Sequence, residues 1–373
     1  MIKLFSIFLL MFILYLLYKN KSIEGFGKLL PTLNPPKGES SVFVHFYDNN
    51  GNMLNVVAIS KPFSSLLDYK TYLTLKSKFK FIGISSYMEF PGLPSNPIDN
   101  YKDFDIHYKD FDNYNLKQPA NIYYTKMYHD ICDLWLHCFK NPSKYLPEDK
   151  NNILISESDF INYKNHMPDK SIEKEFDYMY NCPKVSDTSS CDDWVSHNKN
   201  WTLGQKCIEI LSGKFKLKGL LVGRKNCKLP DYIEKNVKKT GWLNYGENVQ
   251  YYKKCKFLLI PNKIDASPRV ITEAMCYNLP ILVNENILGG WKYVNNTTGI
   301  TFSNIKDFEQ KIPFFIKNLG VYEPRNHIIN NHGPRKTGKK LKEFLYANID
   351  NINIPKEEVE YVTIRNPIYN FSD

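Results

Sequence analysis

Two carboxylates eight positions apart, Asp265 and Glu273, frame the stretch of the sequence with the most chemical content. Between them, Ser267 and Pro268 predict the start of a helix, because serine is a preferred N-cap and proline suits the first helical position. Free backbone amides at a helix start bind anions such as a diphosphate. Arg269 is poorly placed against the helix dipole in the first turn, and a bound anion would account for it. The two carboxylates would then accept hydrogen bonds from sugar hydroxyls.

The same residues also fit a plainer interpretation without a ligand. Apolar runs at Phe257–Ile260 and Ile281–Val283 flank the helix predicted for Pro268–Tyr277. A capped helix between two buried strands would show the same pattern. Spacing alone therefore leaves both interpretations open.

The elements that must position these residues alternate between short apolar runs and helical patterns, as in parallel α/β proteins. Strands are expected in the first half at Ser41–Phe46, Leu54–Ile59, Phe79–Ile84 and Ile153–Ser156, and in the second half at Phe176–Tyr180, Leu217–Val222, Phe257–Ile260 and Ile281–Val283. Helices are expected in the second half at Trp201–Leu211, Glu247–Lys254 and Pro268–Tyr277. Ligands of such sheets bind beyond the carboxyl ends of the strands.

The first half contains one amphipathic pattern. Met127–Cys138 carries apolar residues at the helical period and is followed by Asn141-Pro142, which predicts a helix that ends there. A polar interval, Asn162–Lys174, separates the halves. The chain lacks a G-x-G-x-x-G motif and a Walker A loop, so neither dinucleotide nor P-loop chemistry is indicated.

Leu4–Tyr18 carries no charge and, with Met1 and Ile2, approaches the length that a spanning helix needs, so residues 1–21 are a candidate anchor. No small-residue cleavage site follows it, so an uncleaved single-pass membrane anchor is favoured over a signal peptide. Residues 22–40, with three prolines, are expected to be a linker. Lysines after the run favour a cytoplasmic catalytic domain, whereas three N-glycosylation sequons would permit a lumenal one, so the side of the membrane stays open.

Charge and cysteine content exclude some classes of function. The net charge of +10 suits acidic partners such as nucleotides or anionic lipids. The basic residues are scattered, which argues against a nucleic-acid groove. None of the eight cysteines forms a C-x-x-C pair, so a zinc ribbon or a thioredoxin-like motif is not indicated. Cys182 and Cys191 flank a short polar loop and are a candidate disulfide, weaker than the alternative of free thiols.

The motif around Asp265 resembles the signature of retaining glycosyltransferase family 4 within the GT-B superfamily. That signature is an acidic residue, seven others, a glutamate, Ala-Met or Ala-Leu, a small turn and Pro-hydrophobic-hydrophobic. Here it reads Asp265-x7-Glu273-Ala-Met-Cys-Tyr-Asn-Leu-Pro-Ile-Leu-Val. Further segments resemble the family in the same order, at Phe176–Tyr180, Trp201–Lys206, Lys218–Arg224, Gly241–Leu243, Tyr251–Pro261 and Asn296–Phe302. The likeness covers roughly residues 175–320.

The resemblance implies roles for individual residues. Glu273 would bind the donor ribose, and Asp265, which stands where the family usually has glutamate, would contact the transferred sugar. Ser267, Arg269 and Val270 would lie against the diphosphate.

A basic residue after the first strand of the domain would neutralise the same phosphates. Lys199 is the nearest match, with Lys206 next, although an insertion over Cys182–Asn198 disturbs the alignment. Arg224 is a further candidate that would equally serve as a structural ion-pair partner. No Asp-x-Asp triplet stands in a convincing strand-end context, so neither a metal nor another cofactor is expected.

The acceptor would lie on the first domain. Ser85, Ser86 and Glu89 follow one predicted strand, and Asp159 follows another, so all four are candidate acceptor contacts. Loop capping by serine and aspartate is an equal alternative.

The sequence therefore predicts an α/β protein of the GT-B type, with two doubly wound Rossmann-like domains facing a cleft and a transmembrane helix before them. The expected domains are an anchor (1–21), a linker (22–40), an acceptor domain (41–170), a nucleotide-sugar domain (171–345) and a tail (346–373). The expected enzyme moves a hexose-type sugar from a UDP- or GDP-sugar to a glycan, lipid or protein, with retention, at a membrane. The alternatives are a catalytically idle GT-like membrane scaffold and a sugar-nucleotide epimerase or hydrolase.

Overall fold

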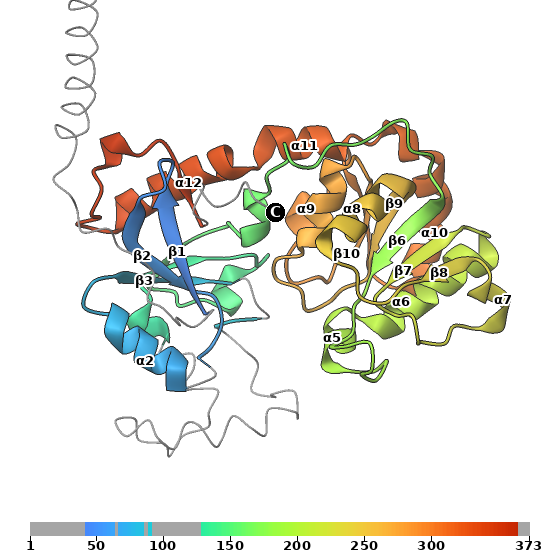
Figure 1. Cartoon of the computed structure of the whole chain (residues 1–373), viewed down its shortest axis with the longest axis horizontal. Helices are drawn as coiled ribbons and strands as arrows, with labels where there is room; N and C mark the ends of the chain where they lie inside the picture. The colour runs from blue at the N-terminus through green and yellow to red at the C-terminus, as the bar shows by residue number, and fades with distance from the viewer. Residues whose placement is uncertain (1–41, 64–65, 86–88, 92–127, 365–373) are drawn as a thin grey trace, which may run out of the picture. The chain divides into compact units, whose positions relative to one another are not determined.

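The computed structural model describes residues 42–63, 66–85, 89–91 and 128–364, and within them it shows two β-sheets (Figure 1). The residues of each sheet belong to hydrophobic clusters of their own. The first sheet has the order β12-β1-β2-β3-β4-β5, and the second has the order β11-β10-β9-β6-β7-β8. Both have helices packed on them, as the alternating sequence pattern predicts.

The second sheet is parallel throughout its described strands and carries the candidate site. Its strands are β6 (Phe176–Asn181), β7 (Gly219–Val222), β8 (Val237–Lys239), β9 (Cys255–Ile260), β10 (Ile281–Asn284) and β11 (Gly299–Phe302). The chain runs outward from β6 to β8, then returns to β9 and runs outward on the other side. Neighbours β6 and β9 therefore form the topological switch point, where loops diverge and leave space for a ligand.

Continuous apolar runs explain why these strands lie at the centre of the sheet. The last four residues of β9 and all four of β10 are buried, as expected for parallel strands covered on both faces. At the first position of β11, a side chain on Gly299 would place its Cβ 1.9 Å from the carbonyl oxygen of Ile281, so only glycine fits there.

Helices connect the strands of the second sheet and cover it. These are α5 (Trp194–Asn198), α6 (Trp201–Ile208), α7 (Asp231–Glu234), α8 (Tyr245–Lys254), α9 (Arg269–Cys276), α10 (Ile305–Lys317) and α11 (Pro324–Asn331). A π-helical segment, Glu209–Lys214, continues α6. The helices predicted around Trp201–Leu211, Glu247–Lys254 and Pro268–Tyr277 are thus present.

The first sheet begins with an antiparallel hairpin and continues in parallel. It contains β1 (Phe43–Asp48), β2 (Met53–Ile59), β3 (Lys80–Ile84), β4 (Leu134–Leu136), β5 (Asn151–Ile153) and β12 (Val362–Thr363), with helix α2 (Leu66–Leu75) between β2 and β3. The four strands from β2 to β5 give this half its Rossmann-like character.

The helix predicted for Met127–Cys138 is wrong over most of its length. Only residues 128–131 are helical within the described part of that segment, and Leu134–Leu136 form β4. Trp135 is fully buried in this strand, where its ring fills the space that a side chain at Gly83 on β3 would need. A strand that is buried on both faces has apolar residues at consecutive positions. A short run of this kind cannot be distinguished from one face of a buried helix by its periodicity alone.

The chain returns to the first sheet after the second one is complete. Helix α12 (Pro334–Asn348) places Leu341 and Leu345 in the first core, among residues of β1 to β4, and β12 pairs with β1 (Figure 1). The sequence predicts a second domain over residues 171–345 and a tail over 346–373. The structure instead gives α12 and β12 to the first sheet, because the apolar face of α12 completes its core.

The predicted anchor (1–21) and linker (22–40) lie outside the described residues. Among the residues that the structure does describe, no helix is both long enough and apolar enough to cross a membrane.

Replacing Leu341 with alanine tests the role of α12 in the first core. Leu341 is fully buried, so truncating its side chain should lower the free energy of unfolding by about 2–5 kcal/mol, as other large-to-small core changes do. The exposed neighbour Lys340, replaced by alanine, is the matched control and should change stability by less than about 0.5 kcal/mol. Urea denaturation measures both, and equal effects would contradict the packing of α12.

Candidate active site

Lys199 and Asp265 form an ion pair at the switch point of the second sheet. The Lys199 Nζ lies 2.5 Å from Asp265 Oδ2, and the two side chains are only 23% and 12% exposed. Asn262 Nδ2 donates to the same carboxylate oxygen at 2.8 Å. Lys199 comes from the loop after β6, and Asp265 from the loop after β9. The sequence analysis predicted both as donor-site residues, and the fold brings them together.

Backbone contacts around the pair fix both loops. Lys199 is the C-cap of α5, and the preceding carbonyl, that of Asn198, accepts hydrogen bonds from the amides of Lys263 and Ile264, each at 3.2 Å. Asn200 adopts a left-handed conformation, and its side chain donates to the carbonyl of Pro261 at 3.0 Å. The loop that presents Asp265 is therefore attached to the segment that presents Lys199.

Helix α9 begins one residue later than the sequence predicts. Its N-cap is Pro268, without a side-chain cap, and its first helical residue is Arg269. Ser267 does not cap the helix, because its hydroxyl lies 2.7 Å from that of Ser158 and accepts the amide of Ser158 at 3.0 Å. The amide of Ile271 donates to the carbonyl of Pro268 at 3.0 Å. The two amides before it, those of Arg269 and Val270, precede the first bond of the helix and can receive an anion.

Glu273 lies one turn inside α9 and is partly buried beside two tyrosines. It accepts a hydrogen bond from the Tyr252 hydroxyl at 2.9 Å. Burial raises the pKa of Glu273, while the Tyr252 hydroxyl and the charge of Arg269 oppose that rise. Burial, with the charge of Glu273, raises the pKa of Tyr245 to about 12. A carboxylate so placed suits hydroxyl groups of a ligand. Tyr252 was not predicted from the sequence, because it lies 21 residues before Glu273 and no local pattern connects the two residues.

Arg224 is fully buried and held by protein groups. Its Nε donates to the carbonyl of Cys182 at 2.7 Å, and its other nitrogens donate to the carbonyl of Cys191 and the hydroxyl of Ser196. The guanidinium also lies 4.7 Å from the ring centroid of Trp201. Arg224 thus has the structural role that the sequence left open, rather than a place in an open donor site.

Cys182 and Cys191, the weaker candidate for a disulfide, do not pair with each other, and the favoured alternative of free thiols holds for Cys182 alone. Cys191 pairs with Cys227, 36 residues away, while Cys182 is a free, buried thiol. The loops after neighbouring strands β6 and β7 lie close in space, which a local spacing rule cannot detect.

The four acceptor candidates differ in their surroundings. Ser85 is buried at the end of β3, with its hydroxyl 3.6 Å from the sulfur of Cys138, and Ser86 lies outside the described residues. Burial raises the pKa of Glu89, and the charges of Lys144 and Lys263 oppose it. Since Lys263 also belongs to the loop of Asp265, Glu89 is within electrostatic reach of the donor-side loop.

Asp159 is the centre of a buried polar network. Its carboxylate forms ion pairs with Lys292 at 2.5 Å and with His332 at 3.1 Å, and it accepts the Tyr293 hydroxyl at 2.8 Å. It also accepts the backbone amide of Ser156 at 2.8 Å. Its oxygens are fully engaged, so this predicted acceptor contact joins segments far apart in the chain instead. Sequence reasoning missed Lys292 because its partner is 133 residues away.

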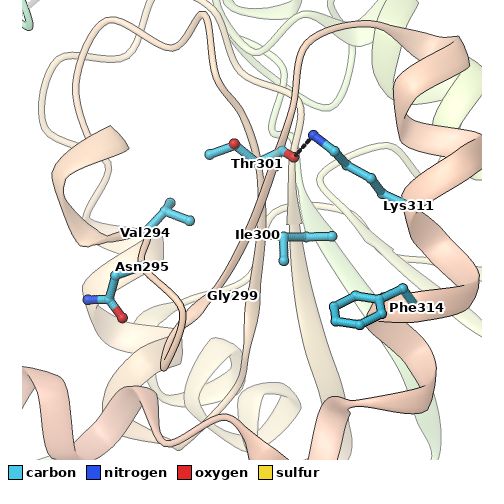
Figure 2. Close-up of a pocket in the computed structure, with 7 residues that line it drawn as sticks. All are labelled: Val294, Asn295, Gly299, Ile300, Thr301, Lys311 and Phe314. Carbon is cyan, nitrogen blue, oxygen red and sulfur yellow. Dashed lines mark hydrogen bonds between the residues drawn. The ribbon is translucent and has the colours of Figure 1, made fainter.

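A cavity of about 430 Å³ lies elsewhere, between β11 and α10 (Figure 2). It is lined by Val294, Asn295, Gly299, Ile300, Thr301, Lys311 and Phe314. Lys311 lies at its rim and donates to the carbonyl of Thr301 at 2.9 Å. None of the predicted site residues lines this cavity.

Across the part of the chain that the structure describes, no group of three or more histidine, cysteine, aspartate or glutamate residues is arranged to hold a metal ion.

The fold itself is shared with proteins of known structure. It is similar to sucrose-phosphate synthase from Thermosynechococcus elongatus, with a TM-score of 0.52 and 10% identity over 76% of this chain and 72% of that one. It is also similar to a lipopolysaccharide outer core galactosyltransferase, with a TM-score of 0.51 and 15% identity over 79% and 76% of the two chains. A protein of Anabaena in complex with UDP gives a TM-score of 0.51 and 10% identity over 75% of each chain. These likenesses show the two-sheet, Rossmann-like GT-B fold.

The sequence matches a family model over part of its second half. Residues 228–333 match the family model described as "Glycosyl transferases group 1". No curated protein matches the chain. The protein is therefore a glycosyltransferase, and its second half contains a group 1 glycosyltransferase domain.

The Asp159 network predicts acid-sensitive stability. Burial alone would raise the pKa of Asp159, but Lys292 and His332 hold it well below its ordinary value of 3.8. A carboxyl group whose pKa is lowered by folding stabilises the folded state at pH values above its ordinary pKa. This stabilisation is lost as the pH falls below the ordinary pKa, because the unfolded chain then binds the proton first. Asp159→Asn should therefore cost about 3–5 kcal/mol at pH 7, because it leaves Lys292 buried without its counterion.

Urea denaturation at pH 7 and at pH 3 measures this effect. The difference between wild type and Asp159→Asn should shrink at the lower pH. Asp133→Asn, at an exposed position, is the control and should differ from wild type by less than about 0.5 kcal/mol at pH 7. A small, pH-independent effect of Asp159→Asn would show that the network contributes little.

Proposed function

We propose that this glycosyltransferase moves a hexose-type sugar from a UDP- or GDP-sugar to a glycan, lipid or protein acceptor, with retention and without a metal. The observation that carries the proposal is the meeting of Lys199, Asp265 and the start of α9 at the switch point of the second sheet. An N-terminal anchor at residues 1–21 would hold the enzyme at a membrane.

The donor nucleotide would lie along the carboxyl edge of the second sheet. Glu273 would accept hydrogen bonds from the ribose hydroxyls, and the amides of Arg269 and Val270 would bind the diphosphate. The ammonium of Lys199 has three N–H donors. One reaches Asp265, so the others remain available for phosphate oxygens.

The rate acceleration would come from stabilising the leaving group. As the glycosidic bond breaks, negative charge develops on the nucleoside diphosphate. Lys199, the side chain of Arg269 and the positive end of α9 would stabilise this charge without reorganising during the reaction. These groups would replace the metal ion that other phosphate-handling sites use. Asp265 would contact the transferred sugar and at the same time orient Lys199.

The acceptor would approach from the first sheet. Glu89 is the best-placed candidate, because the charge of Lys263 in the donor-side loop acts on it. The Anabaena protein of similar fold was determined in complex with UDP, which favours a UDP-sugar over a GDP-sugar as the donor.

Turnover of a panel of UDP- and GDP-sugars tests the proposal. Nucleoside diphosphate release would be measured with and without a mixed glycan and lipid acceptor extract. Wild type should release diphosphate from one donor only when acceptor is present. Glu273→Gln should raise the donor KM about tenfold to a hundredfold, since hydrogen bonds to a charged group contribute about 1.5–3 kcal/mol.

Glu309→Gln is the matched control. Glu309 lies on α10 in an exposed ion pair with Lys214, so its loss should leave the donor KM unchanged. Release that does not depend on acceptor would indicate a hydrolase or epimerase instead. No turnover of any donor, with nucleotide binding retained, would indicate a catalytically idle scaffold.

A further inference from the structure

Residues 182–198 form a segment between β6 and α6 that the Cys191–Cys227 disulfide joins to the loop after β7. We call it the disulfide segment. It ends at Asn198, next to Lys199. Its interior is tied together by Asp193, which caps α5 through the amide of Ser196 at 2.8 Å. The segment therefore leads directly into one member of the candidate donor-site ion pair.

Polar contacts inside the disulfide segment keep its shape. The second carboxylate oxygen of Asp193 accepts the amide of Val185 at 2.6 Å and the hydroxyl of Ser189 at 2.8 Å. The buried ammonium of Lys184 donates to the carbonyls of Asp187 and Ser189, at 2.9 and 2.7 Å. The segment is thus a defined structure although it contains little regular secondary structure.

Covalent and polar links connect the disulfide segment to the loop after β7, among them a hydrogen bond from Asn226 Nδ2 to the carbonyl of Asp187 at 3.4 Å. The covalent link runs through Cys227, and a further polar link is the guanidinium of Arg224, which binds the carbonyls of Cys182 and Cys191 and the hydroxyl of Ser196. Since Ser196 lies in α5, Arg224 and the disulfide together fix that helix against the end of β7.

The far end of α5 holds the loop that carries Asp265. The carbonyl of Asn198 accepts the amides of Lys263 and Ile264, the two residues before Asp265. Lys199 then reaches the Asp265 carboxylate at 2.5 Å. The position of both members of the ion pair therefore depends on where α5 ends, and that depends on the disulfide and Arg224.

We propose that the disulfide segment is the positioning element of the donor site: its Cys191–Cys227 bond and Arg224 hold Lys199 and Asp265 in place, so donor binding depends on the oxidised state. The inference rests on the proposed function of this pair. Reduction would cleave the S–S bond with two electrons and two protons from a dithiol, which is itself oxidised to a disulfide. The two cysteine thiols that result would no longer fix α5.

The test measures binding of UDP and GDP, and donor turnover, by wild type and a Cys191→Ser/Cys227→Ser variant. The variant should bind the preferred nucleotide about tenfold more weakly, within the range that coupled neighbouring sites show. The donor KM should rise while the acceptor KM stays unchanged. Cys132→Ser, which removes a buried free thiol from the first half of the chain, is the control and should keep the wild-type donor KM.

A double-mutant cycle separates positioning from general stabilisation. In a Lys199→Ala background, loss of the disulfide should weaken nucleotide binding by less than about twofold, because the phosphate-binding member of the positioned pair is already absent. Equal losses in both backgrounds would overturn the proposal, since a purely structural contribution would be additive.

Hydrogen exchange provides a readout that does not need activity. The amides of Lys263 and Ile264 should exchange faster in the Cys191→Ser/Cys227→Ser variant and in wild type reduced by a dithiol. Unchanged exchange there would overturn the inference whatever the enzyme binds. Faster exchange in a protein that binds neither UDP nor GDP would instead support the positioning and contradict the proposed function.

Discussion

The parallel order of the second sheet is the constraint on which the site depends. Because β6 and β9 are neighbours whose connections leave in opposite directions, the loops after them meet at one edge. Lys199 and Asp265, 66 residues apart in sequence, therefore form an ion pair. The same edge receives the start of α9, so cationic and anionic groups and unpaired amides converge there. The proposed donor site uses all three.

The two halves of the chain are connected by more than one segment. Helix α12 leaves the second half and packs into the core of the first, and the Asp159 network links residues 156–159 to Lys292, Tyr293 and His332. Buried ion pairs contribute little net stability but strongly disfavour arrangements that leave one charge unpaired. We therefore interpret Asp159 as a residue that specifies how these segments meet, rather than one that contacts the acceptor.

The sequence predicted the elements of the second half well because they follow strong local rules. The apolar run of β9 and the spacing of Asp265 and Glu273 both lie within one motif. Features set by distant residues were not predictable in the same way. The partner of Cys191 lies in the loop after the neighbouring strand β7, 36 residues away. Trp135 belongs to a short strand whose consecutive apolar residues resemble a helical face. Ser267 has the right residue type for a cap, yet its hydroxyl bonds Ser158 of another segment.

A crystal structure with the preferred nucleoside diphosphate bound tests the central claim most directly. The account predicts ribose hydroxyls on Glu273, diphosphate oxygens against the amides of Arg269 and Val270, and a phosphate oxygen within hydrogen-bond distance of Lys199 Nζ. Nucleotide bound instead in the cavity between β11 and α10, or on the first sheet, would contradict the placement of the donor at the switch point of the second sheet.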